Sequence, residues 1–495
     1  MPQEVISQIR AEDARRFKVV PVGFGETGLI VAVSDPLDID TIDSLSFLLQ
    51  REIELVCTSP EKIREALIKY YGTADEASDL LAERLGHDAD LGVELTDGGE
   101  LNTGNETDAP IIRLVSMLLV EAHRLRASDI HLEPLEKKFR IRFRIDGVLQ
   151  EMQAPPKRLQ SAIVSRLKIM TGSMSIAEKR LPQDGRIQVK IARKPIDLRV
   201  STIPTNHGES VVMRLLDKSS LMLGLPELGF LSDDQEIFER LLRLPDGILL
   251  VTGPTGSGKT STLYACLNYM NKPDRKIITV EEPIEYQMNG INQVQVNADI
   301  GMTFPAALRS ILRQAPNIIM IGEIRDLETA SIATNASLTG HLVFSTLHTN
   351  DAASAVTRLL DLGIEPYLVG SSVIGVLAQR LVRRVCEDCA GIHSPLPAEL
   401  KRLEVPNQDW PLARRGRGCP GCRGTGYRGR LGLFELLIVN EPIRRDIAER
   451  ATASRIAASA VAGGMKALRS DGLEKMASGA TTADEVIRVT TKAGD

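Results

Sequence analysis

One glycine-rich turn constrains the fold of this chain more than any other stretch. The segment "GILLVTGPTGSGKTSTLYACL" fills the pattern G-x4-G-K-T between an apolar run and a helical run. Phosphate oxygens must approach backbone N–H groups closely in such a turn, which bulky residues would block, and the helix N-terminus adds a favourable dipole. The pattern predicts a nucleotide-binding P-loop formed by Gly253, Pro254, Thr255, Gly256, Ser257, Gly258, Lys259, Thr260 and Ser261.

The side chains of this loop predict its cofactors. We expect Lys259 to neutralise charge on the β- and γ-phosphates and the Thr260 hydroxyl to ligate Mg²⁺. A glycine-rich turn without a ligand is the competing interpretation, and the preceding strand and following helix argue against it. The expected cofactors are therefore ATP and Mg²⁺.

Acids and histidines next to other apolar strands are candidates for catalysis. Glu281 and Glu282 end the run in "IITVEEPIEY", and Glu323 ends the run in "NIIMIGEIRD". A strand-end carboxylate can also cap a helix or form an ion pair, but the P-loop favours roles for Glu281 and Glu323 in metal binding and activation of water. His341 and His348 flank the strand in "TGHLVFSTLH" and are predicted to sense the γ-phosphate, with a structural role as the alternative.

Composition indicates a globular chain without membrane spans. Of 495 residues, 43% are apolar and 25% are charged, which is typical of a globular protein of about three domains. The net charge of −5 provides no overall attraction to nucleic acid. The most apolar segment, 367–382, is interrupted by polar residues and is interpreted as a core helix, and the first residues lack the order of a signal peptide. We expect a cytoplasmic protein that contacts membranes through partners.

Changes in pattern divide the chain. Residues 1–72 mix a strand, "GLIVAVSDP", with a helix, "PEKIREALIKYYG". Residues 73–108 carry eleven acids and one arginine, which predicts an acidic linker in which "ASDLLAERL" offers one short helix. Residues 109–220 open with an amphipathic helix and continue with alternating strands. Residues 221–495 contain short apolar runs typical of a parallel sheet covered on both faces, and "TADE" near their end offers a capping box.

Four of the six cysteines form two C-x2-C pairs separated by 29 residues. In a reducing compartment this spacing favours metal binding over disulfides. Four thiolates complete a tetrahedral site with no position left for water, so a structural zinc site is predicted within an inserted module, 383–432. Four free core cysteines are the alternative, which the charged surroundings disfavour. The predicted zinc ligands are Cys386, Cys389, Cys419 and Cys422, while Cys57 and Cys266 are expected to fill cores.

The second pair lies in an arginine-rich stretch, "RGRGCPGCRGTGYRGR". A module that reads nucleic acid needs a recognition helix or stacking aromatic residues beside its positive charge. The nearby aromatic residues are Trp410 and Tyr427, and the many glycines disfavour a helix. We therefore interpret the module as a strut and docking surface, and expect no nucleic acid as a partner.

Several motifs occur together in an order that resembles a known family. "GPTGSGKT", "TVEEPIE", "GEIRD" and "TGHLVFSTLHTN" follow "ASDIHLEP", "RFRIDG" and "EKRLPQDGRI" over roughly residues 108–495. This arrangement resembles the secretion ATPases of type II secretion, type IV pilus and DNA-uptake systems, and is closest to the type II secretion branch, called GspE. The N-terminal region matches more loosely, in the segment that docks a membrane-anchored partner in that branch.

The resemblance implies roles for individual residues. Glu281 aligns with the catalytic glutamate of the family, and Glu323 with its Walker B acid. Glu282 departs from the family, which usually has aspartate there. Four arginines align with residues that reach nucleotide or lie in the active-site region: Arg199, Arg214, Arg309 and Arg313. For the last two, a solvated helix face is the alternative.

The resemblance also implies a whole machine. The fold would be α/β, with a RecA-like P-loop ATPase core, a smaller α/β second domain, an N-terminal docking domain and the inserted zinc module. A homo-hexamer bound peripherally to the inner membrane would hydrolyse ATP to power pseudopilus assembly and protein export. Its partners would be a bitopic anchor that binds the N-terminal domain and a polytopic platform protein. A type IV pilus-assembly or DNA-uptake ATPase is the first alternative, and a nucleic-acid translocase is the second.

Overall fold

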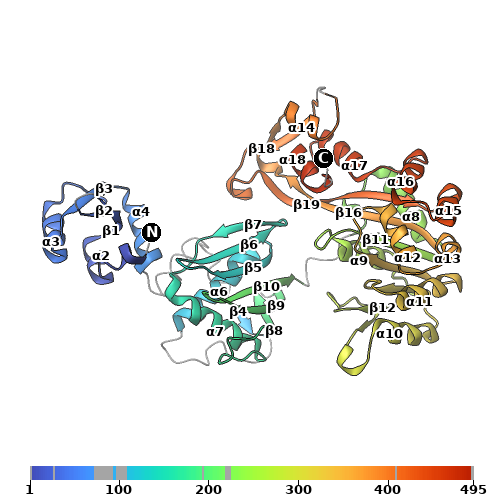
Figure 1. The fold of residues 1–495 in the computed structure, drawn as a ribbon, viewed down its shortest axis with the longest axis horizontal. Coiled ribbons are helices and arrows are strands. Elements are labelled where there is room, and N and C mark those ends of the chain that lie inside the picture. The colour runs from blue at the N-terminus through green and yellow to red at the C-terminus, as the bar shows by residue number, and fades with distance from the viewer. Residues whose placement is uncertain are drawn as a thin grey trace. The chain divides into compact units, whose positions relative to one another are not determined.

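A computed structural model describes residues 3–25, 28–71, 93–95, 109–191, 194–217, 224–406 and 410–491. They form two compact units, Met1–Ser219 and Ser220–Asp495 (Figure 1). The short helix predicted in "ASDLLAERL" lies outside the described residues. Within the described ranges, no helix has both the length and the apolar character needed to cross a bilayer.

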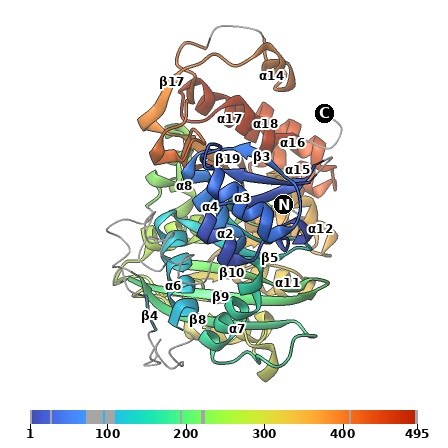
Figure 2. The ribbon, with the colours of Figure 1, turned by 90° about the vertical axis from the view of Figure 1, so that its left-hand side faces the viewer.

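The first unit begins with a three-stranded sheet surrounded by α2, α3 and α4 (Figure 2). β2 pairs antiparallel with β1 and parallel with β3, and the strand and helix predicted for residues 1–72 are present as β2 and α4. Cys57 is exposed, so its predicted place in a core is wrong: it ends β3, an edge strand of the sheet. The elements are α1 (Gln3–Ile6), α2 (Ala11–Phe17), β1 (Val20–Phe24), β2 (Leu29–Val33), α3 (Ile39–Leu49), β3 (Ile53–Cys57) and α4 (Pro60–Tyr71).

A seven-stranded sheet makes up the rest of the first unit, in the order β4-β8-β9-β10-β5-β6-β7 with antiparallel pairs. Side chains alternate along each strand, as in β5, where Ile130 and Leu132 join a core formed with α6 and α7. The opposite face of the sheet is polar. The elements are β4 (Val93–Leu95), α6 (Ala109–Arg124), β5 (Ala127–Pro134), β6 (Phe139–Ile145), β7 (Val148–Met152), η3 (Lys157–Leu159), α7 (Gln160–Thr171), β8 (Gln183–Ile191), β9 (Lys194–Thr205) and β10 (Gly208–Asp217).

The second unit is built on a sheet in the order β13-β12-β14-β15-β11-β16-β19. Its strands are parallel apart from β19, which runs antiparallel to β16, and hydrophobic cores cover both faces. The apolar runs predicted as buried strands are buried strands. In chain order, the elements of this unit up to β16 are η4 (Pro226–Leu228), α8 (Ser232–Leu242), β11 (Gly247–Thr252), α9 (Lys259–Met270), β12 (Ile277–Glu281), β13 (Asn292–Gln295), η5 (Ala298–Ile300), α10 (Phe304–Ile311), η6 (Leu312–Gln314), β14 (Ile318–Ile321), α11 (Leu327–Leu338), β15 (Leu342–Leu347), α12 (Ala352–Asp361), α13 (Pro366–Ser372) and β16 (Val373–Val385).

The segment 367–382 is not one helix, and that prediction is wrong. α13 ends at Ser372, and β16 begins at Val373 between β11 and β19. An apolar run of this length does not distinguish a buried strand from a buried helix by its period alone, and the place in the sheet decides.

The cysteine module is an excursion between β16 and β19 (Tyr427–Ile438), both of which extend beyond the main sheet (Figure 1). Among the described residues, four helices follow β19. The module contains η7 (Glu387–Cys389), β17 (Ala390–Ile392), α14 (Pro397–Arg402), β18 (Arg414–Gly416) and η8 (Pro420–Cys422), and the last helices are α15 (Glu441–Ala448), α16 (Ala453–Ala462), α17 (Leu468–Ala477) and α18 (Ala483–Thr490).

Candidate functional site

The P-loop connects β11 to α9 through glycines that no other residue could replace without strain. Gly253, Gly256 and Gly258 have φ angles of 147°, 79° and 89°. A Cβ atom on Gly253 would lie 2.5 Å from the backbone oxygen of Gln379, a contact that excludes any side chain. The backbone therefore curls tightly and leaves Pro254 and Gly256 exposed in front of the first turn of α9.

Lys259 begins α9 and folds back over the loop. Its Nζ donates to the carbonyl oxygens of Gly253 at 2.7 Å and Pro254 at 3.2 Å. Burial lowers the pKa of Lys259 below its ordinary value; Glu323 opposes this shift and Arg380 adds to it. Phosphate oxygens would compete with the two carbonyls for this ammonium group, as expected of a P-loop lysine.

Parallel pairing brings the other candidate residues to the same edge of the sheet. Thr252 is opposite Leu347, and Ile321 is opposite both Val280 and Ser345, so β11, β12, β14 and β15 end together. Glu281 ends β12, and Glu323 and His348 follow β14 and β15 by one or two residues. Nε2 of His348 lies 2.9 Å from a carboxylate oxygen of Glu323.

Arg325 links two of the acids at this edge. Its guanidinium pairs with Glu323 and lies 3.0 Å from Glu282. Burial alone would raise the pKa of Glu323, but the hydrogen bond and charge of Arg325 and the hydrogen bond of His348 outweigh it and hold that pKa below the ordinary value. Glu323 thus stays ionised to lower pH than an ordinary glutamate, which suits an acid that faces a metal ion.

Glu281 is 3% exposed and held by three side chains. Thr279 and Gln293 donate to one carboxylate oxygen at 2.6 and 3.1 Å, and the hydroxyl of Tyr264 donates to the other. The carboxylate is therefore oriented by its neighbours before any ligand arrives.

The structure does not bring His341 to this edge. Its Nδ1 lies 2.9 Å from the carbonyl oxygen of Ala336, and its own carbonyl accepts from the N–H of Gly247, where β11 begins. β15 separates it from His348 by a strand of six residues, or about 20 Å. Within one chain, only His348 of this pair faces the P-loop edge.

Arg309 and Arg313 lie on the surface of α10 and η6. Arg309 pairs with Glu328 in the first turn of α11, a helix that begins four residues after Glu323. Arg313 donates to the carbonyl oxygen of Arg309 at 2.8 Å and to the Ser310 hydroxyl at 3.0 Å. Among the described residues, the contacts of both arginines are thus with α10 and α11 rather than with the P-loop, and Arg313 lies next to Gln314, whose carbonyl oxygen accepts from Lys276, just before β12 begins.

Arg199 and Arg214 belong to the first unit, on the polar face of the seven-stranded sheet. They are direct partners on β9 and β10. Nε atoms of Arg214 and of Arg144 each lie 3.1 Å from the buried carboxylate of Asp129, one on each oxygen. The row continues to β8, so five strands align the side chains of Arg186, Arg199, Arg214, Asp129 and Arg144.

Sequence patterns did not reveal the buried polar residues that hold the P-loop and α9 against the neighbouring strands. The buried amide oxygen of Gln379, on β16, accepts from the Thr262 hydroxyl of α9 at 2.7 Å. The Thr252 and Thr349 hydroxyls are 2.7 Å apart and join the end of β11 to the loop after His348. Polar residues inside apolar runs were the available signal, but their partners lie about a hundred residues away.

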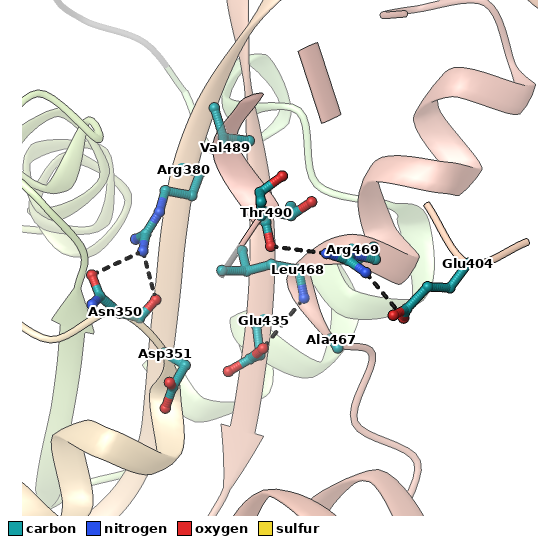
Figure 3. Close-up of a pocket in the computed structure, with 11 residues that line it drawn as sticks. Asn350, Asp351, Arg380, Glu404, Glu435, Ala467, Leu468, Arg469, Val489 and Thr490 are labelled. Atoms are coloured by element: carbon teal, nitrogen blue, oxygen red, sulfur yellow. Dashed lines mark hydrogen bonds and ion pairs between the residues drawn. The ribbon is translucent and has the colours of Figure 1, made fainter. Parts of the chain in front are cut away.

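A cavity of about 610 Å³ lies next to this support (Figure 3). Arg380 donates to the carbonyl oxygen of Asn350 at 2.8 Å, and Glu435 accepts from the backbone N–H groups of Ala352 at 2.9 Å and Leu468 at 3.3 Å. Glu435 thereby caps the first turns of α12 and α17. The lining consists of Asn350, Asp351, Arg380, Glu404, Glu435, Ala467, Leu468, Arg469, Val489, Thr490 and Thr491.

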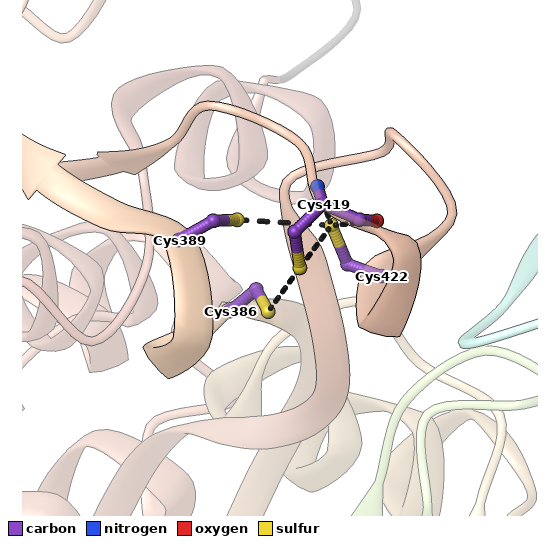
Figure 4. A group of neighbouring side chains, drawn as sticks. All are labelled: Cys386, Cys389, Cys419 and Cys422. Atoms are coloured by element: carbon purple, nitrogen blue, oxygen red, sulfur yellow. Dashed lines mark hydrogen bonds between the residues drawn. The ribbon is translucent and has the colours of Figure 1, made fainter.

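The four cysteines of the module converge, with their sulfur atoms all within 4.8 Å of one another (Figure 4). Sγ of Cys419 lies 3.9 Å from that of Cys386 and 3.6 Å from that of Cys422. Zn–S bonds of about 2.3 Å in a tetrahedron place sulfur atoms about 3.8 Å apart, so these thiols fit zinc. Burial would raise the pKa of Cys422, yet N–H groups of Cys419 and Gly426 donate to its sulfur and the pKa falls to about 6.

The chain matches family models along most of its length. Residues 104–488 match the family described as type II/IV secretion system protein, and residues 1–77 match the MshEN domain. The type IV pilus assembly ATPase PilB of Myxococcus xanthus is 46% identical over 493 residues, covering 98% of this chain and 86% of PilB. The type II secretion system ATPase E of Vibrio cholerae is 47% identical over 463 residues, covering 92% and 91%.

Solved structures share the fold. The pilus retraction motor PilT with bound ADP is 25% identical with a TM-score of 0.51, covering 76% of this chain and 96% of PilT. The ATPase DotB of Legionella pneumophila has a TM-score of 0.55 at 20% identity, covering 75% and 94%, and supports the fold alone. The predicted α/β fold of a P-loop ATPase is thereby confirmed.

Proposed function

The chain belongs to the type II/IV secretion system protein family and is an ATP-hydrolysing enzyme, and from that premise we propose that it is the motor of a type II secretion system. In this proposal a homo-hexameric ring hydrolyses ATP with Mg²⁺ and powers pseudopilus assembly and protein export. The observation that supports it is the sheet edge where the P-loop, Glu281, Glu323 and His348 meet.

The proposed roles follow from the positions of the side chains. Lys259 neutralises phosphate charge, the Thr260 hydroxyl and Glu323 hold Mg²⁺ and its water shell, and Glu281 accepts a proton from the attacking water. When bound, Mg²⁺ supplies positive charge that offsets charge on the β- and γ-phosphates. His348, which contacts Glu323, is the residue through which we propose that the γ-phosphate is sensed.

Arg199 and Arg214 are proposed to supply further positive charge to the nucleotide. The row in which they lie carries more arginines than acids, and Asp129 holds Nε of Arg214, whose side chain remains 55% exposed. Arg309 and Arg313, on α10 and η6, are proposed to belong to the active-site region, as the family resemblance implies.

The remaining parts are proposed to connect the motor to its membrane. The N-terminal domain binds a bitopic anchor, and the zinc module forms a rigid docking surface toward the polytopic platform protein. The enzyme is thus peripheral to the cytoplasmic side of the inner membrane through its partners, without a role for nucleic acid.

A type IV pilus-assembly motor is the second candidate, because PilB of Myxococcus xanthus matches 98% of this chain. Disrupting the gene in its own host distinguishes the two. Loss of protein export with normal surface pili supports the type II secretion motor, whereas loss of pili with normal export supports the pilus motor. Wild-type protein, but not Lys259→Ala, should restore the lost process.

A further inference from the structure

Among the described residues, Tyr264 is the one residue of the P-loop helix α9 that forms a hydrogen bond with Glu281. Its side chain is 4% exposed, and its hydroxyl donates to Oε2 of Glu281. The hydroxyl oxygen of Tyr264 itself accepts from the backbone N–H groups of Glu285 at 3.3 Å and Tyr286 at 3.5 Å. Burial, and the negative charge of Glu281, raise the pKa of Tyr264, so the hydroxyl stays protonated and acts as a donor to the carboxylate.

The donors leave one oxygen of Glu281 able to accept more. A carboxylate offers about four lone-pair positions, two on each oxygen. Among the described residues, Thr279 and Gln293 both donate to Oε1, while Tyr264 donates to Oε2. Oε2 therefore has the lone pair that remains, and its direction is set by the hydroxyl of Tyr264.

The helix that carries Tyr264 also carries the phosphate-binding residues. Tyr264 follows Thr260 by four residues, so the two side chains lie on the same face of α9, one turn apart. Movement of the P-loop helix thus moves the hydroxyl that orients the carboxylate. Tyr264 packs edge-on against Tyr286, with ring centroids 5.7 Å apart, which fixes its ring.

We propose that Tyr264 is a positioning residue for ATP hydrolysis, whose hydroxyl directs the proton-accepting oxygen of Glu281 toward the water that attacks the nucleotide on α9. This inference rests on the proposed function, in which Glu281 accepts that proton. Tyr264 itself does not touch the nucleotide. It acts through Glu281 and keeps the carboxylate oriented toward the phosphate site.

The test replaces Tyr264 with phenylalanine, which removes one oxygen and keeps the ring. In Tyr264→Phe, kcat for ATP should fall about ten- to a hundredfold, while KM and the Kd for a fluorescent ATP analogue change less than about twofold. A residue that only supports the fold would lower kcat and nucleotide binding together, so the split between kcat and Kd distinguishes the two roles.

The matched control is Tyr269→Phe. Tyr269 lies on the same helix, but its hydroxyl contacts Arg243 at 2.9 Å and Glu239 at 3.3 Å, away from the P-loop edge. This variant should keep wild-type kcat and KM. In the background of Glu281→Gln, Tyr264→Phe should cause no further loss of the residual turnover, because the residue acts through the carboxylate.

Other results overturn the proposal. A wild-type kcat in Tyr264→Phe would show that Glu281 needs no such support, and a further loss in the Glu281→Gln background would show that the hydroxyl acts elsewhere. Loss of nucleotide binding would assign the hydroxyl to folding and would overturn the proposal as well. The proposed function fails separately, if wild-type protein does not hydrolyse ATP or Glu281→Gln keeps full turnover.

Discussion

We expect replacement of Lys259 and replacement of Glu281 to impair nucleotide binding and ATP hydrolysis to different extents. Lys259→Ala leaves phosphate charge without its cation, so hydrolysis should fall to background and nucleotide affinity should weaken. Glu281→Gln keeps the size of the side chain but cannot accept a proton, so turnover should fall about 10²- to 10⁴-fold with nucleotide affinity retained. Steady-state ATPase assays and nucleotide titrations measure both quantities. An equal loss of binding in the two variants would contradict this division.

Among individual residues, the sequence predicted those whose identity is required by phosphate binding. The glycines of the P-loop were found because phosphate must approach the backbone closely, and Gly253, Gly256 and Gly258 all have positive φ angles. Tyr264 and Gln379 were missed because their roles depend on partners brought close by the sheet, Glu281 for one and Thr262 for the other. His341 was grouped with His348 by its motif, although the direction of β15 separates them.

Among the elements, the cysteine module should depend on metal while the main sheet does not. Elemental analysis should find one zinc per chain, retained in Mg-free buffer and removed by a chelator. Cys419→Ser should lose the metal and expose 383–432 to proteolysis, yet still bind nucleotide. Cys57→Ser, at an exposed cysteine of another sheet, is the matched control and should keep the metal. Metal-free wild-type protein with four native thiols open to alkylation would contradict the site.

Elements with a strong local pattern were predictable, and those decided by long-range contacts were not. Fully buried strands such as β11 and β14 were read correctly from apolar runs. The capping box in "TADE" is absent: Thr482 makes no cap hydrogen bond and instead contacts the Tyr427 hydroxyl at 2.8 Å. Glu485 accepts from the backbone and side chain of Arg383 at 2.8 and 2.9 Å, which no local pattern could indicate.

For the whole molecule, the N-terminal domain should be separable from the motor. A variant that begins at Asp108 should bind and hydrolyse ATP without partners, because the P-loop edge is formed within Ser220–Asp495. It should no longer sediment with inner membranes that contain the secretion platform, whereas full-length protein should. Equal sedimentation of both proteins would place the docking surface elsewhere.

The proposed ring would allow an arginine to reach the nucleotide of a neighbouring subunit. We expect Arg214 to act in this way, because each active site in a head-to-tail ring faces the next subunit. Lys259→Ala and Arg214→Ala should each be nearly inactive, since such an arginine is worth about 10³- to 10⁵-fold in rate. An equal mixture, after subunit exchange, should regain activity at roughly a quarter of sites. A silent mixture with confirmed exchange would contradict action between subunits.

The pairing of β16 with β19 shows that the cysteine module is an insertion between two adjacent strands. Val385 and Tyr427 are partners across the two strands, so the module leaves the sheet and returns to it at adjacent positions. A tight turn between Val385 and Tyr427 would close the sheet equally well, so the sheet itself does not require the excursion. The module packs against the rest of the unit through an apolar patch, in which Leu403 packs with Met476 of α17 and Val486 of α18. A chain without the module would expose Met476 and Val486 to solvent, and we expect polar residues at those two positions wherever the excursion is replaced by a tight turn.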